Sequence, residues 1–133
     1  MAESLVLEPK VSQKKVDINV QIDQVLTQVR ELGIMVPNSS ALQKYLSRYP
    51  DIVDMIIPIC KQVKGKFKYS SQISLELYRD PEIVDEYITI YVRQRNYDES
   101  VMNRIEEIEA KYEKELIDKK GWIIITTDFQ QPR

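Results

Sequence analysis

Residues 73–93 read ISLELYRDPEIVDEYITIYVR, and the alternation at the two ends of this stretch decides the fold. Apolar residues recur at every second position in 73–77 and again in 88–92. A period of two places successive side chains on opposite faces of a half-buried β-strand. The loop between the two runs contains Pro81 and several acidic residues, a composition that favours a turn. The stretch therefore predicts an antiparallel hairpin.

The same alternation predicts two chemically different sheet faces. One face is expected to pack under helices and carries Ile73, Leu75, Leu77, Ile88, Ile90 and Val92. The opposite face is expected to be exposed and carries Glu76, Tyr78, Tyr87, Thr89, Tyr91 and Arg93.

Outside the hairpin, the spacing of apolar residues is mostly helical. Stripes at three to four residues predict three helices before the hairpin, within 16–32, 39–49 and 51–64, and a fourth from about 98 to 116. Asp51 is the predicted N-cap of the third helix, and Pro58 is predicted to kink or divide that helix. Residues 122–127 are apolar and β-branched, which predicts a third strand.

The predicted order is three helices, a β-hairpin, a helix and a third strand. This is an α+β fold with a small, mainly antiparallel three-stranded sheet and helices on one face. Because the hairpin makes the first two strands neighbours, the third strand belongs at an end of the sheet. We expect a flexible N-terminal arm over residues 1–14 and a single α+β domain over 15–133.

Three stretches of the second half form a specific pattern: SLELYRDPE at 74–82, EYITIYVR at 86–93, and GW followed by TTDF within 121–129. This pattern resembles that of a family of small uncharacterised bacterial proteins, over roughly residues 50–132. The resemblance implies no activity, cofactor or site residue, because no function is known for that family.

Composition excludes several classes of site. The 133 residues contain no histidine, one cysteine and three glycines, and the formal net charge is −2. Without histidine there is no Ser-His or Cys-His catalytic pair and no histidine ligand for zinc. Three scattered glycines form no phosphate-binding loop. A single cysteine, Cys60, and the absence of a secretory or membrane-spanning stretch point to a cytoplasmic protein.

The hairpin loop is the one candidate metal site. Its four carboxylates, Asp80, Glu82, Asp85 and Glu86, are the oxygen ligands that Mg²⁺ and Ca²⁺ prefer. On this alternative reading the protein is a small metal-dependent enzyme acting on a phosphate ester, which Arg79 or Arg93 would face. The favoured reading is a solvated turn in which Asp80 bonds its own backbone, with no metal or other cofactor.

Two further groups of residues are candidates for binding. The predicted exposed face and the third strand offer Glu76, Tyr78, Tyr87, Tyr91, Arg93 and Trp122 to a protein partner, although cross-strand pairs also stabilise a sheet without any ligand. A basic stretch interleaved with Phe67 and Tyr69 could bind phosphate, but lysines at a helix C-terminus more often complement the helix dipole. Its lysines are Lys61, Lys64, Lys66 and Lys68. Given the acidic balance, nucleic acid is not an expected partner.

The sequence therefore favours a non-catalytic protein-interaction or regulatory module over an enzyme. Residues 122–125 are apolar on both faces, and an apolar strand at the end of a sheet needs a cover. Two covers are available: the N-terminal helix of the same chain, or the same strand of a second copy related by two-fold symmetry. We favour the second copy, because the N-terminal helix already has partners in the next two helices, and this predicts a homodimer through Trp122–Thr127.

Overall fold

The computed structural model describes residues 18–67, 71–83 and 85–133 of the chain, and the predicted arm 1–14 lies outside these residues. An N-terminal helix runs to residue 31. The remaining elements are α2 (Ser39–Arg48), the 3₁₀ turn η1 (Pro50–Ile52), α3 (Val53–Lys66), β1 (Ser71–Arg79), β2 (Glu86–Gln94), α4 (Ser100–Ile117) and β3 (Ile123–Thr126). This order confirms the predicted α+β fold.

The three strands form one sheet in the order β1-β2-β3. β1 and β2 pair antiparallel, with Leu75 opposite Ile90, so the predicted hairpin is confirmed. β3 lies at the end of the sheet, as predicted, and runs parallel to β2 with Ile88 opposite Ile123. The sheet is therefore mixed, with one antiparallel and one parallel pair, and not mainly antiparallel as predicted. The reason is that α4 carries the chain back across the sheet before β3 begins.

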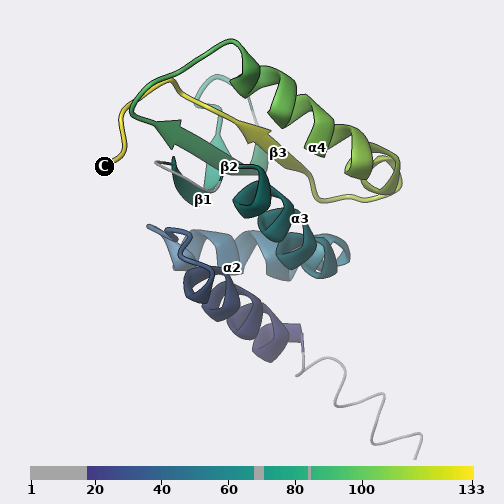
Figure 1. Cartoon of the computed structure of the whole chain (residues 1–133). Helices are drawn as coiled ribbons and strands as arrows, with labels where there is room; N and C mark the ends of the chain where they lie inside the picture. The colour runs from purple at the N-terminus through teal and green to yellow at the C-terminus, as the bar shows by residue number, and fades with distance from the viewer. Residues whose placement is uncertain (1–17, 68–70, 84) are drawn as a thin grey trace, which may run out of the picture.

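The hydrophobic core lies between the helices and one face of the sheet. The predicted core residues on this face are buried, except Leu77, which is only partly buried. Leu77 borders an open cavity beside α2, and this position explains its exposure. Figure 1 shows α4 running alongside β3, with α3 between α4 and the more N-terminal helices. The described helices thus leave the other face of the sheet uncovered.

The predicted apolar stripes turn inward as expected. Leu42, Tyr45 and Leu46 of α2 are buried, and the side chain of Asn38 caps this helix by accepting a hydrogen bond from the Ala41 amide. Gly33 has φ +84° just after the N-terminal helix, a left-handed conformation that glycine adopts at helix C-termini. Sequence spacing therefore predicted which side of each of these helices packs against the core.

One prediction about the third helix is wrong, and another is wrong in part. Asp51 is not the N-cap of α3, because it lies in η1 and its carboxylate accepts hydrogen bonds from the amides of Lys120 (2.6 Å) and Gly121 (3.3 Å). The predicted division of the helix at Pro58 is also wrong, because α3 runs through this residue as one helix. The burial of its other side chains against the core offsets the backbone hydrogen bond that proline cannot make.

None of the helices in the described ranges is long and apolar enough to cross a membrane.

Candidate functional site

The sheet face without a helix, which we call the outer face, carries a row of three aromatic side chains at one end. Tyr78 of β1 lies directly opposite Tyr87 of β2, and their rings stack with centroids 4.9 Å apart and 25° between planes. The register of β2 and β3, extended by one residue, places Trp122 next to Tyr87. Tyr78 and Trp122 are 36% and 37% exposed. The row therefore presents preformed aromatic surface to solvent.

At the other end of the outer face, Arg93 forms a charge cluster. Its guanidinium donates to the carboxylate of Asp128 at 3.0 and 3.1 Å and to that of Glu76 at 3.4 Å. It also lies over the ring of Tyr91, 4.8 Å from the centroid. Burial opposes the charges of Arg93 and Asp128, but their mutual hydrogen bonds prevail, so the pKa of Asp128 is lowered and that of Arg93 is raised.

The chain after β3 covers this end of the face. Asp128 follows the strand, and farther along the amide of Arg133 donates to the side chain of Gln72 on β1 at 2.8 Å. The side chain of Gln131 donates to the carbonyl of Arg95 at 2.9 Å, which fixes the segment beside the end of β2. Under this segment Arg93 is only 1% exposed.

The prediction that the whole outer face is exposed is therefore wrong for Arg93 and Thr89. Arg93 can be buried under the C-terminal segment because the carboxylate of Asp128, in the same segment, neutralises its charge. Thr89 is a small residue flanked by Tyr87 and Tyr91 two positions away on the same face, and it is buried. Within the described residues, its hydroxyl oxygen has no hydrogen-bond partner. Only part of the predicted binding set can thus meet a partner: Glu76, Tyr78, Tyr87, Tyr91 and Trp122.

The four carboxylates of the hairpin loop do not form a metal site. Glu86 is held in ion pairs with Arg48 and Arg79, both at 3.2 Å. Asp80 accepts a hydrogen bond from the amide of Glu82 at 2.9 Å, as the turn reading predicts. No three acidic, cysteine or histidine side chains converge as a possible metal site anywhere in residues 18–67, 71–83 and 85–133. The geometry gives no support to the metal-dependent alternative.

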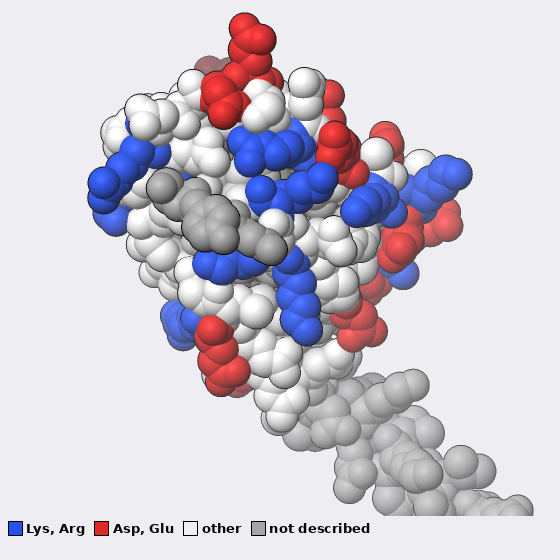
Figure 2. Space-filling model, in the orientation of Figure 1, with Lys and Arg blue, Asp and Glu red and all other residues white. Residues whose placement is uncertain are grey.

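The described part of the basic stretch lies on the face of the molecule where Figure 2 shows lysine and arginine side chains gathering. Phe67 is buried and its ring is covered by the guanidinium of Arg104, 4.7 Å from the centroid, so it cannot stack on a base. Lys66 is paired with Glu107 at 2.7 Å. Lys68 and Tyr69 lie outside the described residues. The described part of the stretch therefore offers positive charge but no exposed ring.

Cys60 is a buried core residue, as its place on an apolar stripe predicts. Burial raises the pKa of its thiol to about 12, so the thiol stays protonated and unreactive near neutral pH.

A groove beside β3 is the feature that sequence reasoning missed. It has a volume of about 290 Å³ and lies between α4 and the edge of β3 that faces away from β2. The side chain of Glu109 reaches this edge and accepts a hydrogen bond from the amide of Ile125 at 3.4 Å. Burial raises the pKa of the Glu109 carboxyl, and the neighbouring Glu106 and Glu113 raise it further. The signal in the sequence that could have revealed this groove was Glu109, an acidic residue on the half-buried side of α4.

No protein-family model matches the chain, and comparisons with curated proteins and with solved structures find no significant match.

Proposed function

We propose that this protein is a non-catalytic interaction module of the cytoplasm, and that it binds another protein, or a second copy of itself, through the outer face of its sheet. The observation that carries the proposal is the aromatic row of Tyr78, Tyr87 and Trp122 on a face that no described helix covers; Tyr78 and Trp122 are exposed, and Tyr87 is partly buried against Tyr78. Tyrosine and tryptophan are enriched among the residues that contribute most to protein–protein binding.

The stacking of the two tyrosines supports binding beyond its contribution to the sheet. Each ring is held by the other, so little side-chain entropy remains to be lost when a partner covers them. Burial and neighbouring charges raise the pKa of Tyr87, which keeps its phenol neutral and able to donate a hydrogen bond. A partner that supplies an apolar surface with acceptor groups at its rim fits this row.

Three groups that could take part in catalysis are buried or paired, which supports a non-catalytic role. The cysteine is buried, the cationic Arg93 is neutralised by Asp128 and Glu76, and Glu86 is neutralised by two arginines. The outer face therefore carries recognition chemistry in its aromatic row and a closed ion cluster at its other end.

Affinity purification with matched variants tests this proposal. The Tyr78→Ala/Tyr87→Ala protein is compared with wild type and with Met102→Ala, which removes an exposed apolar side chain from α4. We expect wild type and Met102→Ala to retain the same partner, or the same dimer in sedimentation equilibrium, and the double variant to lose it. Equal retention by all three, with unchanged thermal melts, would show that the aromatic row is not the binding surface.

A further inference from the structure

The two edges of the sheet are finished differently. At the β1 edge, Met35 pairs with the strand: its amide donates to the carbonyl of Ile73 at 2.9 Å, and its carbonyl accepts from the amide of Leu75 at 2.8 Å. At the β3 edge, no strand of the described chain pairs. The carbonyl of Trp122 faces β2, so the backbone groups of Ile123 and Ile125 face outward.

Glu109 occupies the place where a neighbouring strand would accept a hydrogen bond. Its carboxylate takes the outward amide of Ile125 at a long 3.4 Å. The carbonyl of an added strand would make this bond with better geometry. The carboxylate that it displaced would then need a positive partner, because it is half-buried and its charge is disfavoured there.

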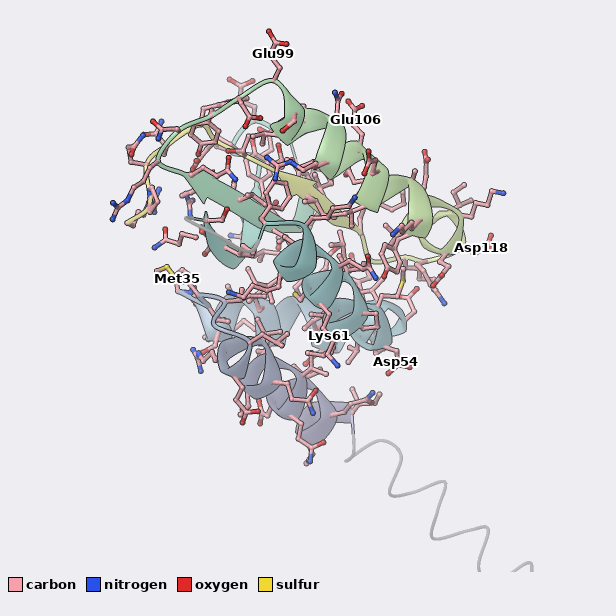
Figure 3. The ribbon with its side chains drawn as sticks, viewed as in Figure 1. Met35, Asp54, Lys61, Glu99, Glu106 and Asp118 are labelled. Atoms are coloured by element: carbon pink, nitrogen blue, oxygen red, sulfur yellow. The ribbon has the colours of Figure 1, made fainter. Side chains whose placement is uncertain are left out.

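The groove beside this edge has the lining that such a strand requires. Apolar side chains from α3, α4 and β3 form most of its wall, and Trp122 stands at one end. The charged residues that line it are all acidic and lie on α4, where Glu106 projects from the helix (Figure 3). These are Glu106, Glu109 and Glu113.

A second copy of β3 fits this groove poorly. Two β3 strands paired antiparallel about a two-fold axis would place both α4 helices on the same face of the joined sheet. The acidic side of one α4 would then face the acidic side of the other, and like charges at close range are repulsive. Charge complementarity therefore selects an occupant other than this strand.

We propose that the open edge of β3, with the acidic groove of α4, binds an extended polypeptide strand that carries lysine or arginine at alternate positions. The cationic side chains face α4, where their methylene stems cover the apolar wall and their charges meet the glutamates. The intervening apolar side chains lie beside Ile124 and Trp122 at the end of the outer face, while the backbone extends the sheet. This inference does not depend on the aromatic row binding a partner.

Fluorescence of Trp122, the only tryptophan in the chain, provides the measurement. The probe is an acetylated, amidated peptide in which lysine and valine alternate. We expect it to change the tryptophan emission saturably, with a Kd no weaker than about 1 mM. Two control peptides are needed: one alternates glutamate with valine, and one is the lysine peptide with N-methylated amides on its pairing edge. Neither should bind, because the first is repelled and the second cannot form the ladder.

Matched variants then assign the site. Glu109→Gln/Glu113→Gln should weaken binding about tenfold, whereas Glu115→Gln, which removes an acid of α4 outside the groove, should change it less than about twofold. Equal binding of the N-methylated peptide, or no effect of the double variant, would overturn the proposal. It would also be overturned if the double variant dimerised while wild type ignored the peptide, because Glu109 would then serve only to keep the edge from pairing with itself.

Discussion

The two faces of this sheet come from the same alternating sequence but solve different problems. On the helix face, Leu75 and Ile90 lie opposite each other and are fully buried in an apolar core. On the outer face, Glu76 and Thr89 lie opposite each other, and burial there leaves a hydroxyl unpaired. The first face is organised for stability. The second tolerates charge, exposed rings and an unsatisfied group, a composition that agrees with the proposed role in binding.

The largest expected effect breaks the helix face. Leu75→Ala removes a fully buried side chain, and we expect a loss of about 2–5 kcal/mol in the free energy of unfolding, from lost burial and the cavity left behind. Denaturant melts measure it. Leu77→Ala, on the same strand and face but only partly buried, is the control and should cost clearly less. Equal losses would mean that the two positions do not differ in packing.

On the outer face we expect a smaller effect of the opposite sign, a gain in stability. Thr89→Val keeps the shape of the side chain and removes the hydroxyl that has no partner, so we expect a gain of about 1 kcal/mol in the free energy of unfolding. Thr126→Val, half-buried on the same face, should change stability by no more than about 0.5 kcal/mol. A loss of stability in Thr89→Val would indicate that a water molecule satisfies this hydroxyl.

Local sequence predicted the parts of this fold that depend on local periodicity. The alternation in 73–77 and 88–92 was enough to pair β1 with β2, since a slip of one residue would turn every apolar side chain away from the core.

Contacts between distant residues decided what the sequence could not show. Asp51 does not cap α3 because its carboxylate accepts hydrogen bonds from backbone amides about 70 positions later in the chain. The burial of Arg93 depends on Asp128, 35 positions away, although Asp128 continues the period of two from β3 and so belongs to the same face. The acidic groove required knowing which side of α4 lies against β3.

The smallest expected effect on stability concerns Glu109, at the edge of β3 that separates the helix face from the outer face. The pKa of Glu109 is raised in the folded protein, mainly by burial and also by Glu106 and Glu113. A carboxyl whose folded pKa exceeds its unfolded value stabilises the fold below the unfolded pKa, and this stabilisation is lost as pH rises through the folded value. Glu109→Gln keeps an acceptor for the Ile125 amide and removes the charge, so it should match wild type at low pH.

At neutral pH we expect Glu109→Gln to be more stable than wild type by about 0.5 kcal/mol or less, because the variant no longer holds a half-buried charge. Paired denaturant melts at about pH 4 and pH 7 measure the difference, with Glu115→Gln as the control for removing one negative charge from α4. A stability gain that is equal at both pH values would argue against the raised pKa. A gain confined to neutral pH would mean that the Glu109 carboxylate at the edge of β3 lowers the stability of the fold. This is expected if the carboxylate serves to bind a cationic strand.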